Sequence, residues 1–240
     1  MEKSIVIVGA GHAGVSCAAS LRSLGFEGTL TIVDSQEGCP VEKPPLSKGA
    51  IVNGCDKDYL IPLLRPKNWY RDNRIDLKTG VKVTSIDRGA KKINLSDENS
   101  IPYTKLVLAT GATPIELGIT KTHPQSFTLR TSNDAKKISK AASNFKSALI
   151  IGGGYIGLEV AASLTERGLK VTLVESESRL LAKISSSIIA ERLVKLHEKK
   201  GVSFIFNDAV VGVDQFEKGF RAVLNSETHI TVEMIVTGVG

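Results

Sequence analysis

The sequence predicts an α/β protein built from two Rossmann-like nucleotide-binding domains, each with a three-layer ββα architecture. The glycine fingerprint G-x-G-x-x-G occurs twice, each time between a short apolar run and a segment of helix formers that leads to a second apolar run and an acidic residue. A chain of 240 residues also has room for two small domains. We expect the first domain at residues 1–113 and the second at residues 114–240.

The second copy of the fingerprint is complete. Ala148–Ile151 is a continuous apolar run, typical of a strand buried on both faces. Helix formers follow over Leu158–Arg167, and Gly168 is a natural helix stop. Val171–Val174 predicts the next buried strand, and Glu175 stands at its end. The fingerprint glycines are Gly152, Gly154 and Gly157.

Each glycine of such a fingerprint has its own role in holding a dinucleotide. The first allows a tight turn, the second lets the backbone approach a pyrophosphate, and the third lets the helix lie close to the strand. The N–H groups at the start of the helix are then directed at the phosphates. Glu175 is placed to accept a hydrogen bond from a ribose 2′-hydroxyl and to repel a 2′-phosphate, which favours NAD(H) over NADP(H).

The first copy, Ile5–Asp34, repeats this pattern. Asp34 ends its second strand, and Gly25 corresponds to Gly168 as a helix stop. The fingerprint glycines are Gly9, Gly11 and Gly14. Two fingerprints indicate two nucleotide sites, which suits two cofactors that exchange electrons. The repeat therefore favours a redox enzyme.

Composition favours a globular protein of the cytoplasm. Apolar residues make up 42% of the chain and charged residues 23%, and no apolar run is long enough to span a bilayer. The chain enters its first strand directly, so we expect no signal peptide and no membrane association. The net charge of +6 is scattered without aromatic interleaving, so we expect no nucleic-acid partner. The basic excess is either a solvated surface or one that steers an acidic protein or anionic cofactor.

Cysteines and histidines predict no metal site. Cys17, Cys39 and Cys55 form neither a C-x-x-C pair nor an even framework, as expected of reduced thiols. The four histidines are isolated from one another and from the cysteines. Cys17 is expected in the core, and the side chain of His12 in the first glycine loop is expected to be incidental.

The remaining segments give weaker signals. Residues 35–70 are irregular and fixed by prolines, which suits either an active-site wall or a plain surface loop. Residues 81–95 alternate as two antiparallel strands, Tyr103–Leu108 predicts another strand, and residues 115–127 read as a polar linker. After the second fingerprint, the pattern predicts a helix at about Ser186–Lys199 and strands at Val202–Phe206, Val210–Phe216, Phe220–Asn225 and Met234–Val236.

Five segments together resemble one family. They are PPLSKGAI at 44–51, LLRPKNWY at 63–70, IDLKTGVKVTSID at 75–87, ATGATP at 109–114 and LRTSNDA at 129–135. The chain resembles the NADH:ferredoxin reductases, the branch of putidaredoxin and rubredoxin reductases within the FAD-dependent pyridine nucleotide–disulfide oxidoreductase superfamily. The resemblance implies FAD and NAD(H) as cofactors, hydride transfer from NADH to FAD, and electron transfer to a ferredoxin-type iron–sulfur protein.

The resemblance also implies contact residues for both cofactors. For FAD these are Gly9, Gly11, Ala13, Gly14, Asp34, Ser35, Lys43, Lys48, Val83, Ala109, Thr110, Gly111 and Arg130. For NAD(H) they are Gly152, Gly154, Tyr155, Ile156, Gly157, Glu175 and Gly238. The chain departs from the pattern at four positions: Asp34 stands where glycine is usual, Ser35 where the acid is usual, Val41 where tyrosine is common, and Lys43 where arginine is frequent.

Three residues have implied catalytic roles. Lys48 and Glu159 would meet beside the flavin, and Tyr155 would be an aromatic gate that moves to admit nicotinamide. Each has a plain structural alternative. Glu159 would otherwise be a first-turn carboxylate favoured by the helix dipole, Lys48 a solvated lysine, and Tyr155 a ring packed against the strand.

Two other functions remain open at this point. One is an NADH oxidase, peroxidase or disulfide reductase that uses Cys39. The other is a nucleotide-binding fragment without turnover, since the resembling family continues beyond Gly240 into a second FAD motif and a C-terminal domain. On that comparison the first domain is incomplete, and we expect the chain alone to retain little FAD.

Overall fold

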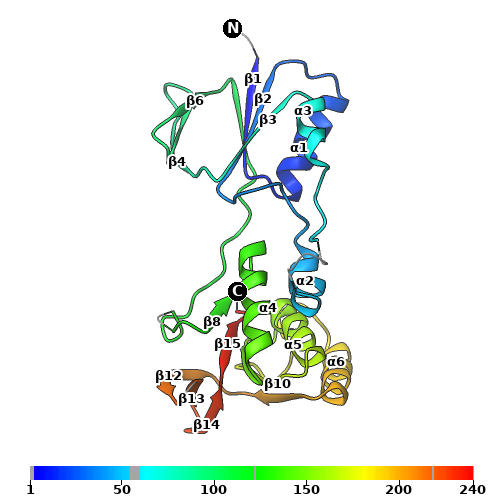
Figure 1. Ribbon diagram of the computed structural model, residues 1–240, viewed down its shortest axis with the longest axis vertical. Helices are drawn as coiled ribbons and strands as arrows, with labels where there is room; N and C mark the ends of the chain where they lie inside the picture. The colour runs from blue at the N-terminus through cyan, green and yellow to red at the C-terminus, as the bar shows by residue number, and fades with distance from the viewer. Residues whose placement is uncertain (1–2, 55–59, 122, 218, 240) are drawn as a thin grey trace. The chain divides into compact units, whose positions relative to one another are not determined.

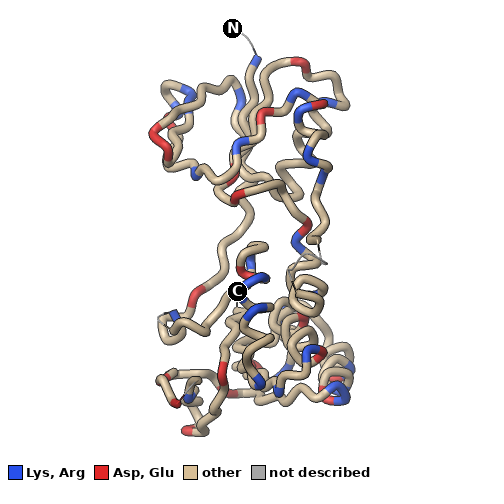
Figure 2. The backbone as a smooth tube through the Cα atoms, viewed as in Figure 1, with Lys and Arg blue, Asp and Glu red and all other residues tan. Residues whose placement is uncertain are grey.

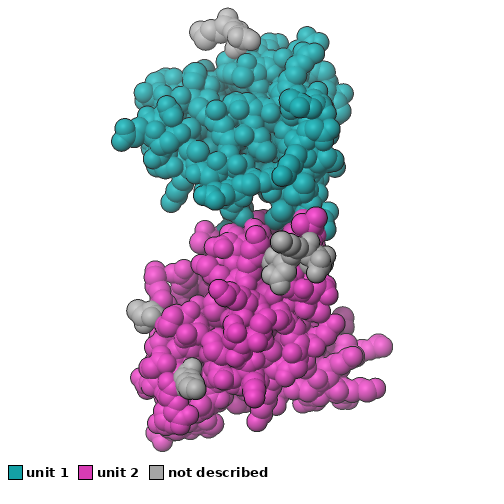
Figure 3. All heavy atoms as spheres, viewed as in Figure 1, with its two compact units in different colours: residues 1–42, 62–112 teal, residues 43–61, 113–240 magenta. Residues whose placement is uncertain are grey.

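The computed structural model describes residues 3–54, 60–121, 123–217 and 219–239. The chain divides into two compact units (Figure 3). The first unit comprises Met1–Glu42 and Pro62–Ala112, and the second comprises Lys43–Ile61 and Thr113–Gly240. Both carry a parallel sheet with helices on one face and an antiparallel sheet on the other, which confirms the predicted α/β class.

The first unit is built on a four-stranded parallel sheet in the order β3-β2-β1-β7 (Figure 1). Its strands are β1 (Ser4–Val8), β2 (Thr29–Asp34), β3 (Ile75–Thr79) and β7 (Lys105–Leu108). Alternate side chains of each strand point to opposite faces. Ile7 therefore packs on the helix side with α1 (His12–Ser23) and α3 (Lys67–Asp72), whereas Val6 packs on the other side.

The other face of this sheet is covered by a small antiparallel sheet. It consists of β4 (Val83–Asp87), β5 (Lys92–Leu95) and β6 (Ser100–Pro102). Ile93 and Leu95 of β5 are buried against Val6 and Val33 of the parallel sheet. The two apolar faces of β1 thus explain why its sequence is a continuous apolar run.

The second unit repeats this design on a five-stranded parallel sheet in the order β11-β10-β9-β15-β8. The strands are β8 (Ser126–Thr128), β9 (Ser147–Ile151), β10 (Lys170–Glu175), β11 (Val202–Phe206) and β15 (Met234–Thr237). Ala148 and Ile150 of β9 face a helical layer, while Leu149 and Ile151 face an antiparallel layer.

The helical layer contains α4 (Ser132–Asn144), α5 (Tyr155–Glu166) and α6 (Ser187–Lys200) (Figure 1). Thr131 begins α4 with a capping box, since its hydroxyl accepts the N–H of Asp134 while the Asp134 carboxylate accepts the N–H of Thr131. Gly201 ends α6 in the left-handed region at φ +103°. The antiparallel layer consists of β12 (Val210–Phe216), β13 (Gly219–Leu224) and β14 (His229–Val232).

The segment 43–61 packs within the second unit, not within the first domain where its sequence position placed it. It contains the short helices η1 (Pro44–Ser47) and α2 (Gly49–Val52). Leu46, Ala50 and Ile51 are buried in the same apolar cluster as residues of α4 and α5. The burial of these three side chains on α4 and α5 accounts for the difference.

Short strands are the other difference from the predicted elements. The predicted polar linker 115–127 ends in β8, which pairs with β15 at the edge of the sheet. β6 and β14 were not predicted either; they pair with β5 and β13 in the two antiparallel layers. All three have three or four residues, too few for periodicity to reveal them. No helix in the described residues is long and apolar enough to cross a membrane.

Candidate functional site

The glycine loop of the second unit forms a tight cradle between β9 and α5. Gly152 has φ +103°, and its N–H donates to the carbonyl of Val174 at 2.8 Å. A Cβ on Gly157 would lie 2.0 Å from the carbonyl oxygen of Gly152, so a larger residue cannot occupy this position without a backbone shift. A Cβ on Gly154 would meet nothing closer than 3.7 Å. The second glycine therefore has open space on the side where a ligand would approach.

The first unit repeats this cradle between β1 and α1. Gly9 has φ +106°, and its N–H donates to the carbonyl of Val33 at 2.7 Å. A Cβ on Gly14 would lie 1.9 Å from the carbonyl oxygen of Gly9, whereas a Cβ on Gly11 would meet nothing within 4 Å. The three glycines of each loop thus divide the same tasks: one turns the chain, one leaves space, and one brings helix and strand together.

A carboxylate at the end of the second strand holds each glycine loop. Asp34 Oδ2 accepts the N–H of Ala10 at 2.6 Å, and Glu175 Oε2 accepts the N–H of Gly153 at 2.6 Å. The second oxygen of Asp34 accepts the N–H of Gln36, and that of Glu175 accepts the N–H of Glu177. Asp34 therefore occupies the place in the first unit that Glu175 occupies in the second. Each carboxylate oxygen keeps a lone pair for a further donor such as a ribose hydroxyl.

A third strand closes each cradle from the other side. The N–H of Ala109 donates to the carbonyl of Val8 at 2.8 Å, and the N–H of Gly238 donates to the carbonyl of Ile151 at 2.8 Å. Ala109 and Gly238 are thus equivalent positions in the repeat. A Cβ on Gly238 would lie 3.0 Å from both N and Cα of Gly157, which explains a glycine at this position.

Both helices that leave the loops begin without a side-chain cap. Gly11 is the N-cap of α1 and Gly154 is the N-cap of α5, and neither N-terminus receives a side-chain hydrogen bond. The first N–H groups of a helix need acceptors, and a phosphate supplies them together with a charge that the helix dipole favours. Each unit therefore has four features that fit a dinucleotide: a glycine turn, open space at the second glycine, a helix N-terminus without a cap, and a carboxylate at the end of the second strand.

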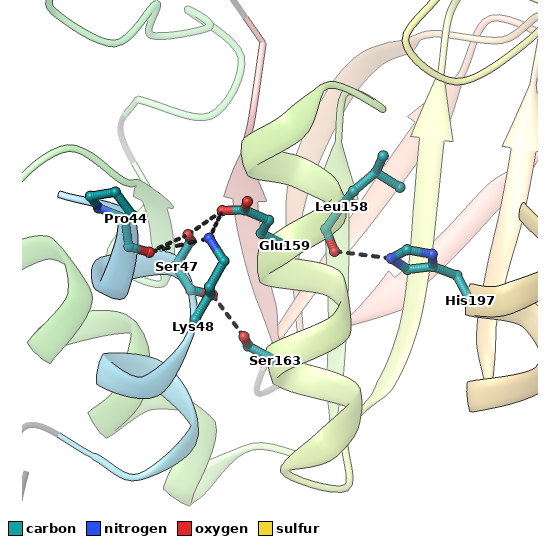
Figure 4. A network of polar contacts seen from close by, with 7 residues as sticks. All are labelled: Pro44, Ser47, Lys48, Leu158, Glu159, Ser163 and His197. Carbon is teal, nitrogen blue, oxygen red and sulfur yellow. Dashed lines mark hydrogen bonds and ion pairs between the residues drawn. The ribbon is translucent and has the colours of Figure 1, made fainter. Parts of the chain in front are cut away.

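Lys48 and Glu159 form an ion pair within the second unit, between the segment that contains η1 and the first turns of α5 (Figure 4). Lys48 Nζ lies 2.8 Å from Glu159 Oε2 and 3.2 Å from the carbonyl oxygen of Pro44. The side chains are 53% and 34% exposed. The hydroxyl of Ser47 donates to the same carboxylate oxygen, and the hydroxyl of Ser163 donates to the carbonyl of Ser47 at 2.7 Å. Lys48 is therefore not a freely solvated lysine.

Tyr155 and Ile156 open α5 next to the second glycine loop. The tyrosine is 60% exposed and the isoleucine 40% exposed. The Tyr155 ring is thus not packed against the strand, and both side chains stand at the rim of the cradle. Glu159 follows one helical turn later, so the glycine loop, Tyr155 and the ion pair are set by a single helix.

The other predicted FAD contacts are divided between the units. In the first unit, Ser35 follows β2, Val83 begins β4, and Thr110 and Gly111 follow β7. Ala13 lies in the first turn of α1 and is exposed. Lys43 and Arg130 belong to the second unit, and Arg130 lies between β8 and α4. In the first unit, the structure joins Gly9, Gly14, Asp34 and Ala109 around the glycine loop, while Val83 packs in the antiparallel layer. Lys43, Lys48 and Arg130 are described within the second unit.

Three polar residues near the site were not selected from the sequence. Ser47 and Ser163 are buried at 2% and 4% exposure, and both belong to the network around Glu159. Arg179 donates to the carbonyls of Ala182 and Ser185, which directs its guanidinium into its own loop. Neither charge nor hydrophobic periodicity marks a buried serine in a sequence. Only its position beside Lys48 could have drawn attention to Ser47.

Cys39 has the properties of a packed thiol. It is half-buried against the apolar cluster of the first unit, and burial raises the pKa of its thiol, an effect that Lys67 partly opposes. Cys17 is also half-buried in that cluster, and Cys55 lies outside the described residues. Among the described residues, no group of three or more His, Cys, Asp or Glu side chains is placed to hold a metal ion.

Comparison with known proteins gives a consistent result. The family model described as pyridine nucleotide-disulphide oxidoreductase matches residues 3–240. Rhodocoxin reductase of Rhodococcus erythropolis is 37% identical over 239 residues, which cover 99% of this chain and 56% of that protein. The chain thus spans little more than half the length of that relative.

Two solved structures are similar throughout the chain. The ferredoxin reductase for the CYP199A2 system from Rhodopseudomonas palustris gives a TM-score of 0.94 at 30% identity, covering 99% of this chain and 59% of that chain. Putidaredoxin reductase in its covalent complex with putidaredoxin gives a TM-score of 0.91 at 31% identity, covering 99% and 58%.

Proposed function

The chain belongs to the pyridine nucleotide-disulphide oxidoreductase family, and from this premise we propose that it forms the nucleotide-binding part of a flavoprotein that transfers hydride from NADH to FAD and passes electrons to a ferredoxin-type iron–sulfur protein. The family consists of oxidoreductases that use FAD and NAD(H). We assign FAD to the cradle of the first unit and NADH to that of the second.

The observation that carries this proposal is the duplicated cradle. Hydride transfer between two cofactors needs two nucleotide sites, and each unit offers the same glycine turn, uncapped helix and carboxylate. When bound, FAD would accept a hydride and release single electrons, which is chemistry that no side chain supplies. The task of the chain is therefore to bind, orient and electrostatically tune the two nucleotides.

We propose separate sets of binding residues for the two nucleotides. For FAD the proposed residues of the first unit are Gly9, Gly11, Ala13, Gly14, Asp34, Ser35, Val83, Ala109, Thr110 and Gly111. For Lys43, Lys48 and Arg130, which belong to the second unit, an FAD contact stays a prediction from the family resemblance. For NADH the proposed residues are Gly152, Gly154, Tyr155, Ile156, Gly157, Glu175 and Gly238. Asp34 and Glu175 would each hold an adenosine ribose, a role supported by their equivalent hydrogen bonds to the glycine loops.

Lys48, Glu159 and Tyr155 are the proposed catalytic group. Glu159 of the ion pair lies on α5, the helix whose N-terminus would hold the NADH pyrophosphate, so the pair would be fixed relative to the nicotinamide. A paired lysine and glutamate keep both charges beside the reacting rings and bias the potential there. Tyr155, exposed at the rim of the cradle, would act as the ring that moves aside when nicotinamide enters.

NADH is the proposed nucleotide in preference to NADPH. Glu175 would repel a 2′-phosphate, and the nearest arginine beyond it, Arg179, has its guanidinium bound to the carbonyls of Ala182 and Ser185. A positive charge held in this way is not directed at the ribose site.

The proposed electron acceptor follows from the relatives and from charge. One relative is named rhodocoxin reductase, and the two solved neighbours are a ferredoxin reductase and a reductase caught in a complex with putidaredoxin. Lys and Arg residues occur along the chain in both units (Figure 2), and the net charge is +6, which suits an acidic protein partner. A reaction that uses Cys39 as a redox thiol has less support, because a half-buried thiol with a raised pKa is a poor nucleophile at neutral pH.

Two matched substitutions test the assignment of the cradles. Gly11→Ala and Gly154→Ala each add a methyl group where the fold has room, so both variants should fold while the methyl blocks close approach of a pyrophosphate. We expect Gly154→Ala to weaken NADH binding at least tenfold without changing binding of added FAD, and Gly11→Ala to do the reverse. Calorimetric titration measures both. An equal effect of either variant on both nucleotides would contradict the assignment.

The proposed reaction is tested in a protein extended to the length of its relatives. Its NADH-dependent reduction of a purified [2Fe–2S] ferredoxin is followed by absorbance, with FAD added. Reduction should be lost in both glycine variants. If NADH is oxidised with oxygen or a disulfide as acceptor, and not with the ferredoxin, the proposed partner is wrong.

A further inference from the structure

Ser47 has one proton to donate and two possible acceptors. Its hydroxyl lies near Glu159 Oε2, and the carbonyl oxygen of Pro44 is 3.5 Å away. Lys48 Nζ already donates to that carbonyl at 3.2 Å. A hydrogen bond to a carboxylate is about twice as strong as one between neutral groups, so the proton of Ser47 is committed to Glu159.

The backbone of Ser47 is held independently of its hydroxyl. Its carbonyl accepts the hydroxyl proton of Ser163 at 2.7 Å, in the middle of α5. Both serines are buried, at 2% and 4% exposure. The donor is therefore fixed in place by the same helix that carries Glu159. Glu159 and Ser163 lie about one turn apart on α5, and both contact Ser47 (Figure 4).

Lys48 alone is poorly suited to hold the carboxylate. Its side chain is 53% exposed, and an exposed ion pair contributes little because water competes and a long side chain loses entropy. The short, buried side chain of Ser47 loses little entropy when it donates. Because both donors meet on Oε2, a carboxylate fixed by Ser47 presents that oxygen to Lys48.

We propose that Ser47 is a positioning residue that fixes the Glu159 carboxylate and thereby forms the Lys48–Glu159 pair before any nucleotide binds. The importance of the pair for hydride transfer rests on the proposed function, but its formation within the second unit does not. Ser47 acts through Glu159 and has no direct contact with a reacting atom.

The chemical reactivity of Lys48 tests this in the 240-residue chain without cofactor. A lysine whose Nζ is held by a carboxylate and a carbonyl is less available to an acylating reagent than a lysine without these contacts. Acetylation of each lysine at limiting reagent is measured by peptide mass spectrometry, with Lys170, an exposed lysine of the same unit, as internal reference. Glu159→Gln defines the rate without the pair, expected to be two- to fivefold higher, as a loss of up to about 1 kcal/mol implies.

Four serine variants distinguish the effect of the Ser47 hydroxyl from the effect of the packing around it. Ser47→Ala should raise the rate at Lys48 to that of Glu159→Gln, and Ser47→Cys should do the same, since a thiol fills the space but is a weak donor. Ser47→Thr, which keeps the hydroxyl, should restore the slow rate. Ser163→Ala keeps the donor but removes one anchor of its backbone, so it should raise the rate by less than Ser47→Ala does.

Three outcomes would overturn the proposal. The first is a Lys48 rate that does not change in either Ser47→Ala or Ser47→Cys. The second is a Lys48 rate in Ser47→Cys as slow as in the unmodified chain while Ser47→Ala is fast. The third is an increase in Ser163→Ala as large as that in Ser47→Ala. A failure of NADH to reduce flavin would leave all of these rates untouched, so it would contradict the proposed function alone.

Discussion

Arg167 donates a hydrogen bond of 2.8 Å from its Nη1 atom to the carbonyl oxygen of Ile51, across 116 residues of sequence. The same guanidinium donates to the carbonyl and hydroxyl of Ser139 and to the hydroxyl of Ser143. One side chain at the end of α5 thus joins α2 and α4. The segment that carries Lys48 is anchored at this end, and the ion pair forms at the other.

We expect Arg167→Lys to loosen α2. Lysine keeps the charge but cannot reproduce the planar fork, so several of the four contacts are lost at a cost of about 1–2 kcal/mol. Hydrogen exchange at the amides of Ile51, Val52 and Asn53, which are bonded within this turn, should become about five- to thirtyfold faster. Arg88→Lys, in the exposed β4–β5 turn, is the matched control. Unchanged exchange in α2 would show that apolar packing alone holds the segment.

Glu175 should determine the choice between NADH and NADPH. Calorimetric titration of the chain should show tighter binding of NADH. Glu175→Ala should weaken NADH binding about tenfold and reduce the preference for NADH over NADPH. The reason is that the carboxylate both accepts a hydrogen bond from the ribose 2′-hydroxyl and repels a 2′-phosphate. Glu175→Gln keeps a hydrogen-bond acceptor without the charge, so it should recover part of the NADH affinity while still admitting NADPH. Tighter NADPH binding by the unmodified chain would contradict this assignment.

The Lys48–Glu159 pair should behave as one unit in hydride transfer. In a protein extended to the length of its relatives, Lys48→Met and Glu159→Gln should each slow flavin reduction by NADH. The double variant should lose less than the sum of the single losses, with a coupling of about 1 kcal/mol, because removing either partner already ends the interaction. Stopped-flow absorbance gives the rates. Additive losses would mean that the two residues act separately.

The parts of the fold that the sequence predicted are those with a repeated local signal. Both βαβ units carry apolar runs buried on two faces and glycines whose Cβ atoms would strike backbone, so periodicity and composition sufficed. The equivalence of Asp34 and Glu175 could not be established from sequence. It follows from the hydrogen bond between Asp34 and the N–H of Ala10, which matches the one between Glu175 and the N–H of Gly153.

What the sequence did not predict depends on contacts between distant segments. The segment 43–61 joins the second unit through the buried side chains of Leu46, Ala50 and Ile51 and through contacts with the polar residues Arg167, Ser139 and Ser163, which have no periodic signature. β8 has only three residues, and what defines it as a strand is its pairing with β15 at the edge of the sheet. Local pattern predicts elements, whereas polar contacts and sheet edges decide where short ones pack.

Cys39 should be unreactive near neutral pH. Burial raises the pKa of its thiol, so little thiolate is present, and alkylation by iodoacetamide at pH 7.5 should be slower than that of a free cysteine. The rate should increase as the pH rises beyond about 9, where an ordinary thiol is already ionised. Peptide mass spectrometry follows the position separately from Cys17. In the extended protein, Cys39→Ser should keep NADH-dependent electron transfer; its loss would favour a reductase that uses this thiol.

Tyr70 is a buried residue whose hydroxyl has no hydrogen-bond partner within the described residues. Burial raises the pKa of this phenol to about 12, and Cys39 adds to the effect while Arg65 opposes it. Tyr70→Phe removes the unsatisfied hydroxyl and keeps the ring, so we expect the free energy of unfolding of the first unit to rise by about 1 kcal/mol at pH 8. Tyr103→Phe, in the same unit, is the matched control and should change it less.

The effect of Tyr70 should also depend on pH in a defined direction. The folded pKa of about 12 lies above the unfolded value of about 10, so the unfolded state releases this proton first. The contribution of the neutral phenol to stability is therefore complete below about pH 10 and is lost as the pH rises toward 12, by up to about 2–3 kcal/mol. Trp69, the one tryptophan of the chain, lies 5.2 Å from the Tyr70 ring and reports unfolding of this unit by fluorescence. Between pH 10 and 12 the unmodified chain should lose more stability than Tyr70→Phe, whereas parallel pH profiles would show that the phenol ionises equally in both states.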